Sequence, residues 1–184
     1  TTPCGGSIFI QATASLNLND VKILSNEAFL GGGLYTNGTL TMVGGVLANN
    51  VGGFGGAIRG RGAIIDLTNT VIGGTTPADA NTASFIGGGG IAINDTPLTL
   101  TNVTIQNNTT TGNGGGILEI FISAGGQPLS ISNSFIANNI ATLDGGGIYN
   151  EAGNLTISAS RFLNNESQRF SASEPHGGGA IFNK

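Results

Sequence analysis

The stretch Gly55-Gly56-Ala57-Ile58 decides the fold, because its pattern of two glycines, a variable residue and an aliphatic residue recurs along the whole chain. The shortest interval between two copies is 24 residues and the longest is 33 residues. A period of this length is typical of a solenoid, in which each copy forms one rung. The aliphatic residues of the copies are Ile8, Leu34, Ile58, Ile91, Ile117, Ile148 and Ile181.

A second pattern follows the glycines and alternates apolar with polar residues, as in Leu16-Asn17-Leu18 and Leu155-Thr156-Ile157. Strict alternation is typical of a strand with one buried face. Each repeat thus holds three short candidate strands, and no repeat can bury its apolar face alone. The sequence therefore predicts an all-β parallel solenoid of about six to seven rungs of 24–33 residues. A further core column follows this pattern at Ile23, Leu47, Ile72, Ile105, Ile136 and Phe162.

A polar column is expected three residues after each of these core positions. Asparagine dominates it, and an asparagine amide can both donate and accept hydrogen bonds along a stack. We predict that this column forms a structural ladder that satisfies backbone groups at a corner of the solenoid. Its expected members are Asn26, Asn50, Thr75, Asn108, Asn139 and Asn165.

Rung length varies at defined places, and the extra residues predict protruding loops. Two insertions are expected at one corner, near residues 76–85 and 167–176, and a third at another corner, over residues 119–127. Insertions on one face of a solenoid often carry binding. His176, the single histidine, falls in the second insertion and is expected to be exposed to solvent.

Composition excludes several classes of function. Lysine and arginine number six in 184 residues and do not cluster, so we expect neither a nucleic-acid partner nor an anionic membrane surface. No run of about 18 apolar residues is present, so we expect no membrane insertion. The single cysteine, Cys4, cannot form an internal disulfide.

The chain is not expected to be an enzyme. A β-helix lyase or glycosidase needs convergent carboxylates, whereas Asp66 is the only acid in its strand column. Asp144 is expected in a solvated turn, and so are Arg59 and Arg61, the one local basic pair. No catalytic residue, metal ligand or cofactor site is predicted.

The repeats resemble those of the chlamydial polymorphic outer-membrane proteins. The family signature pairs Gly-Gly-Ala-Ile with Phe-x-x-Asn, and it stands literally at residues 55–58 and 178–181 and at residues 162–165. Degenerate copies, such as Ile105-Gln106-Asn107-Asn108, cover the rest of the chain. The resemblance implies a right-handed parallel β-helix at a cell surface, in large secreted or autotransporter-like adhesins.

We therefore expect residues 1–184 to form a single domain, a segment of a longer or polymerising protein. The expected function is that of a non-catalytic extracellular structural or adhesive module, as a head-to-tail filament subunit or a passenger segment of a surface adhesin. The expected partners are other copies, bound through uncapped ends, and a host or matrix glycan or protein. The alternative is a carbohydrate-binding or polysaccharide-lyase-like β-helix.

Overall fold

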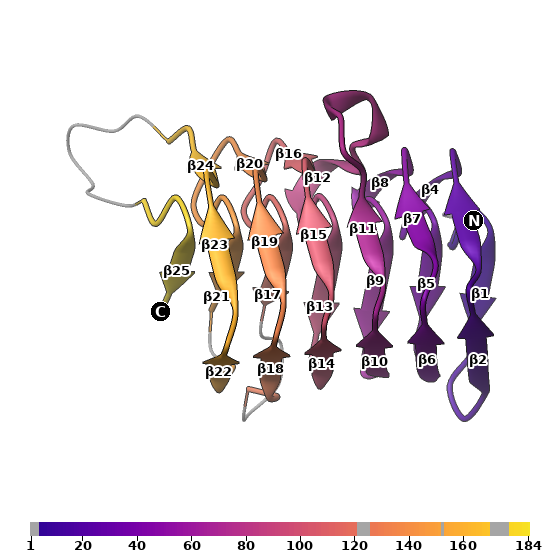
Figure 1. Ribbon diagram of the computed structural model, residues 1–184. Coiled ribbons are helices and arrows are strands. Elements are labelled where there is room, and N and C mark those ends of the chain that lie inside the picture. The colour runs from indigo at the N-terminus through magenta and orange to yellow at the C-terminus, as the bar shows by residue number, and fades with distance from the viewer. Residues whose placement is uncertain (1–3, 121–125, 152, 170–176) are drawn as a thin grey trace.

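The computed structural model describes residues 4–120, 126–151, 153–169 and 177–184, and it is a right-handed parallel β-helix (Figure 1). Successive rungs follow one another along a single axis, and the same elements recur in each rung (Figure 1). Every strand pair is parallel, and strands pair only between neighbouring rungs. The predicted fold class is therefore confirmed.

Four sheets run along the axis, each built from one strand per rung. The first sheet contains β1 (Ile8–Ile10), β5 (Leu34–Thr36), β9 (Ile58–Arg61), β13 (Ile91–Asn94), β17 (Ile117–Ile120), β21 (Ile148–Asn150) and β25 (Ile181–Asn183). The second sheet contains β2 (Ser15–Asn19), β6 (Thr39–Val43), β10 (Ile64–Thr68), β14 (Leu98–Thr101), β18 (Leu129–Ser132) and β22 (Leu155–Ser158).

The other two sheets complete each rung. The third sheet contains β3 (Lys22–Leu24), β7 (Val46–Ala48), β11 (Val71–Gly73), β15 (Thr104–Gln106), β19 (Phe135–Ala137) and β23 (Arg161–Leu163). The fourth sheet contains β4 (Glu27–Leu30), β8 (Val51–Phe54), β12 (Thr82–Gly87), β16 (Thr109–Thr110), β20 (Ile140–Ala141) and β24 (Glu166–Ser167).

The fourth sheet departs from the sequence prediction, which gave three strands per repeat. Its strands begin one residue after the ladder asparagine and are as short as the two residues of β16 and β20. Their inward positions hold small residues such as Gly52, Ala83 and Ala141 instead of large aliphatic ones. A strand this short and this poor in large apolar residues gives no periodic signal.

The predicted core positions stack in register from rung to rung. Ile8 pairs with Leu34, Leu34 with Ile58, and Ile58 with Ile91 in the first sheet. The column that contains Ile105 pairs in the same way in the third sheet. In the inner rungs these side chains are completely buried, so each rung completes the core of its neighbours.

Both glycines of the repeated motif are needed where the chain enters the first sheet. Gly55 has a φ of +65°, a left-handed conformation that side chains with a Cβ rarely adopt. A Cβ on Gly56 would lie 2.2 Å from the carbonyl oxygen of Gly89 in the next rung. The first glycine therefore makes the turn, and the second allows neighbouring rungs to approach at the spacing of a sheet.

An asparagine ladder links the six rungs at the corner between the third and fourth sheets. The Oδ1 of Asn108 accepts from the Nδ2 of Asn81 at 2.9 Å, and the Nδ2 of Asn108 donates to the Oδ1 of Asn139 at the same distance. That Nδ2 also donates to the carbonyl of Ile72 in the preceding rung, at 3.0 Å. The ladder members are Asn26, Asn50, Asn81, Asn108, Asn139 and Asn165.

Asn81 occupies the rung position that the sequence prediction gave to Thr75, so that prediction was wrong. Thr75 is exposed, whereas Asn81 is completely buried and donates to the carbonyl of Leu47 at 2.9 Å. The fixed spacing of three residues after Ile72 failed because this rung carries its insertion before the ladder position. A small residue two places after each ladder member, here Ala83, was the signal that would have found it.

Candidate binding groove

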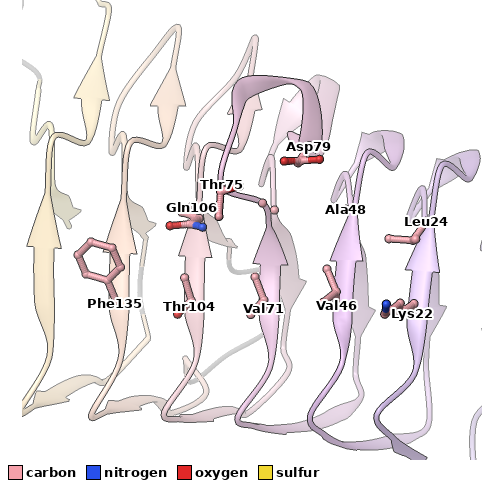
Figure 2. A pocket seen from close by; sticks show the side chains of 12 residues that line it. Lys22, Leu24, Val46, Ala48, Val71, Thr75, Asp79, Thr104, Gln106 and Phe135 are labelled. Carbon is pink, nitrogen blue, oxygen red and sulfur yellow. The ribbon is translucent and has the colours of Figure 1, made fainter.

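A hollow lies on the outer face of the third sheet and runs along the solenoid axis (Figure 2). Its volume is about 590 Å³, which lies within the range of ligand sites in proteins. Because side chains alternate along a strand, Val71 and Gly73 of β11 face outward while Ile72 between them faces the core. The lining residues are Lys22, Leu24, Val46, Ala48, Val71, Gly73, Gly74, Thr75, Asp79, Thr104, Gln106 and Phe135.

Small residues create this hollow. Ala48 and Gly73 occupy the outward position that neighbouring rungs fill with Leu24 on one side and Gln106 on the other. A larger residue could not replace Gly73, which has a φ of +94° and whose added Cβ would lie 1.9 Å from the carbonyl oxygen of Gln106. The backbone geometry of β11 therefore keeps the middle of the groove empty of side chains.

The insertion of the third rung borders the groove at the end of β11, and we call it the overhang. Residues 74–80 leave the end of β11, form the 3-10 helix η1 (Pro77–Asp79) and return to the ladder (Figure 1). The sequence prediction placed the insertion at residues 76–85, but Thr82 to Gly87 form strand β12. The overhang is thus an insertion before the ladder asparagine rather than after it.

Hydrogen bonds fix the overhang to both neighbouring rungs. The Oδ2 of Asp79 accepts from the backbone N–H of Thr76 at 3.1 Å and from its Oγ1 at 2.9 Å. The carbonyl of Asp79 accepts from the N–H of Asn49 in the preceding rung at 3.0 Å. The Nδ2 of Asn107 in the following rung donates to the carbonyl of Gly74. The overhang is therefore preformed, which lowers the entropic cost of binding beside it.

The groove combines an aliphatic floor with polar and aromatic borders (Figure 2). Val46 and Val71 form the floor, and Thr104 and Gln106 supply a hydroxyl and an amide next to it. Lys22 lies at one end and Phe135 at the other, with the face of its ring turned outward (Figure 2). The guanidinium carbon of Arg161 lies 5.7 Å from the centre of that ring, in the range of a cation–π contact.

The predicted site residues lie elsewhere in the fold. The ladder asparagines and the core stacks occupy the inside of the solenoid, on the opposite side of the third sheet from the groove. The predicted loop at residues 167–176 lies outside the described residues from 170 onward, and so does His176. Residues 121–125 of the third predicted loop also lie outside them. Sequence reasoning missed the groove, because it followed only the inward positions of these strands.

Arg59 is a correction to the sequence prediction. It belongs to β9 rather than to a solvated turn and is 5% exposed. Its guanidinium donates to the carbonyls of Gly60 and Ala92 and to the Oδ1 of Asn94, and it lies over the ring of Phe54. Burial lowers the pKa of Arg59 to about 10.

The acidic residues form separate contacts. Asp144 is buried rather than solvated, and its Oδ2 pairs with Arg169 at 2.7 Å. Glu119 is also buried, and its Oε2 accepts from the backbone N–H groups of Glu151 and Gly153. Within residues 4–120, 126–151, 153–169 and 177–184, no group of three or more acids, histidines and cysteines could hold a metal ion. Nor does this part of the chain contain a helix with the length and apolar character of a membrane span.

One comparison with known proteins gives a match. The family described as the Chlamydia polymorphic membrane protein repeat matches residues 102–118. This segment contains the degenerate signature at residues 105–108 and the glycine motif at residues 114–117. No curated protein and no solved structure matches the chain. Residues 102–118 are thus similar to the repeat of the polymorphic membrane proteins, and in the parallel β-solenoid they run from β15 and β16 of one rung into β17 of the next.

Proposed function

We propose that the chain is a non-catalytic adhesive module of an extracellular or cell-surface protein, and that it binds through the groove on the third sheet. The observation that carries the proposal is the preformed overhang. An insertion in one rung is held by its neighbours at the border of a hollow whose floor is apolar and whose borders are polar. Such a combination is typical of binding sites rather than of surfaces that serve only to separate other parts of a protein.

The repeat match supports the proposed location. Residues 102–118 match a repeat described as that of a membrane protein, and the fold is a rigid stack that can present a site away from its attachment. The low content of charged residues, 9%, and the outward columns of the second sheet that begin at Asn17 and Asn19, which are Thr, Ser and Asn except at Asp66 and Val43, fit a role as a stiff scaffold.

The proposal is tested by coating beads with the purified chain and measuring their attachment to cultured host cells and to extracellular matrix. The matched comparison uses two substitutions of equal size change, Thr104→Trp in the groove and Thr99→Trp on the second sheet. We expect attachment that is lost with Thr104→Trp and kept with Thr99→Trp. Attachment that is equal for both variants, or no attachment by the unmodified chain, would overturn the proposal.

The second candidate function is that of a filament subunit, and the same purified chain tests it. The ladder suits such growth, because each of its four inner asparagines accepts from the ladder member of the rung before it and donates to that of the rung after it. Light scattering that rises with concentration, together with long fibres in negative-stain electron microscopy, is the result expected for a filament subunit. A constant monomer mass at every concentration would exclude it.

A further inference from the structure

We infer that the groove binds an acidic oligosaccharide, a chain of carboxylated pyranose rings that runs along the solenoid axis with one carboxylate at Lys22. The inference rests on the proposed function and names the ligand class of the same site. Three features of the groove carry it: its repeat along the axis, the chemistry of its lining and the position of its cations.

The repeat of the groove fits a sugar chain. Neighbouring rungs are about 4.8 Å apart, which is close to the length of one pyranose ring in an extended chain. The groove spans five rungs, from Lys22 through Val46, Val71 and Thr104 to Phe135. Its length is therefore about 19 Å, enough for about four rings. A ligand with the same period could make equivalent contacts at each rung.

The lining offers what a pyranose ring needs. A sugar ring has an apolar face of C–H groups and an edge of hydroxyl groups. The apolar floor of Val46 and Val71 and the outward ring face of Phe135 can pack against the apolar face of the sugar (Figure 2). Thr104 and Gln106, which lie beside the floor, can donate hydrogen bonds to the sugar hydroxyl groups and accept from them. A purely apolar ligand would leave these polar groups without partners.

A cation at one end of the groove, Lys22, and another one rung beyond the other end, Arg161, favour an acidic sugar over a neutral one. The chain has only six lysines and arginines and a net charge of −4, yet Lys22 and Arg161 belong to the same outward column of the third sheet. Lys22 is exposed and forms no salt bridge with any residue that the structure describes. A carboxylate could therefore pair with it without breaking an existing contact.

Asp79 sets the orientation of the acidic group. Its carboxylate lies on the overhang, where Thr76 holds one of its oxygens. A carboxylate of the ligand close to Asp79 would be repelled, whereas a hydroxyl group could donate to it. The charge pattern thus places one carboxylate of the sugar chain at Lys22, and it turns a hydroxyl edge, not the carboxylate, of the ring next to the overhang toward Asp79.

The test is isothermal titration of the full chain with two matched probes, a β-linked tetramer of glucuronic acid and the β-linked tetramer of glucose. The two differ only in whether each ring carries a carboxylate or a hydroxymethyl group. We expect the acidic tetramer to bind about tenfold more tightly, and we expect this preference to shrink as salt is added. Equal binding of both tetramers, or binding of neither, would overturn the inference.

Variants then assign the binding to the groove. Lys22→Gln is expected to weaken the acidic tetramer about tenfold, whereas Arg61→Gln, which removes another exposed cation, from the first sheet, leaves it unchanged. Phe135→Leu is expected to weaken both tetramers about fivefold. Its control is Phe85→Leu, which removes an exposed ring of the fourth sheet. Equal losses in a groove variant and its control would show that the site is not this groove.

The bead assay separates this inference from the proposed function. If beads attach through the groove but neither tetramer binds, the adhesive function stands and its ligand is not an acidic oligosaccharide. If the acidic tetramer binds but the beads do not attach, the ligand class stands and the adhesive function fails. Attachment that survives enzymatic removal of acidic sugars from the cell surface would also overturn the ligand class.

Discussion

The two faces of the third sheet differ although they are built from the same short strands. Its inward column is apolar in every rung, from Ile23 to Phe162. Its outward column reads Lys22, Val46, Val71, Thr104, Phe135 and Arg161, with no residue type common to all rungs. The inward face must repeat because each side chain packs on its equivalents above and below. The outward face has no such requirement, so it can vary and carry a site.

The corner beside this sheet shows the same contrast. On its inner side, the asparagine ladder continues through six rungs with Nδ2 to Oδ1 distances of 2.9 to 3.1 Å. On its outer side, the third rung carries the overhang at residues 74–80. The chain can insert residues there because the insertion leaves and rejoins the ladder without breaking it. Periodicity thus supports the fold, and the departure from periodicity produces the groove.

The sharpest test of this contrast compares two neighbouring positions of β15. Ile105 is completely buried, so Ile105→Ala leaves a cavity in the core and is expected to lower the free energy of unfolding by about 4 kcal/mol. Thr104→Ala on the outward face is expected to change it by less than about 0.5 kcal/mol. Urea denaturation measures both values. Similar costs at the two positions would refute the distinction between the faces.

The ladder assignment is tested at Asn81 and Thr75. Asn81→Ala removes an amide that donates to Leu47 and Asn108 and accepts from Asn50, so we expect a loss of about 3 kcal/mol. Thr75→Ala removes an exposed hydroxyl and is expected to cost less than about 0.5 kcal/mol. Thermal denaturation of both variants provides the comparison. If the larger cost fell on Thr75, the ladder would follow the sequence spacing instead of the structure.

A smaller loss of stability is expected from a substitution in the overhang. A Cβ at Gly74 would lie 2.2 Å from the Cβ of Asp79, so Gly74→Ala must displace the loop. We expect a loss of about 2 kcal/mol. Because the loop lines one border of the groove, attachment in the bead assay should also fall. Gly62→Ala provides a control outside the overhang, since an added Cβ there meets no other atom within 4 Å, although its φ of +59° carries its own strain. Unchanged attachment with Gly74→Ala would separate the overhang from binding.

The smallest effect is expected on the exposed side of β23. Arg161→Gln removes the cation–π contact with Phe135, and the expected loss is about 0.5 kcal/mol. Its matched control, Arg61→Gln, removes an exposed arginine from the first sheet. Chemical denaturation should show a small difference in the free energy of unfolding between the two variants. This difference should disappear when both are combined with Phe135→Leu. A loss as large as that of Ile105→Ala would mean that the outward column also supports the fold.

Much of the fold could be predicted from the sequence because every rung of a stacked core needs the same types of residue at the same positions. The glycine motif, the alternating strands and the core columns all recur at positions that must pack on their equivalents, as Ile58 packs between Leu34 and Ile91. The fourth strand of each rung could not be predicted, since two residues such as Thr109 and Thr110 carry no periodic signal. Thr75 was misplaced because an insertion broke the fixed spacing on which its assignment relied.

What the sequence determined by itself is therefore the inside of this protein: parallel rungs, aliphatic columns and a corner rich in asparagine. Only the tertiary structure decided the outside. The groove needs Lys22, Val71 and Phe135 on one face, although they come from different rungs and share no motif. It also needs the insertion to project from the end of β11 beside the groove, where hydrogen bonds to Asn49 and Asn107 in two other rungs hold it. Inward residues face the same surroundings in every rung and so leave a pattern in the sequence, whereas outward residues meet only through the stacking of the rungs.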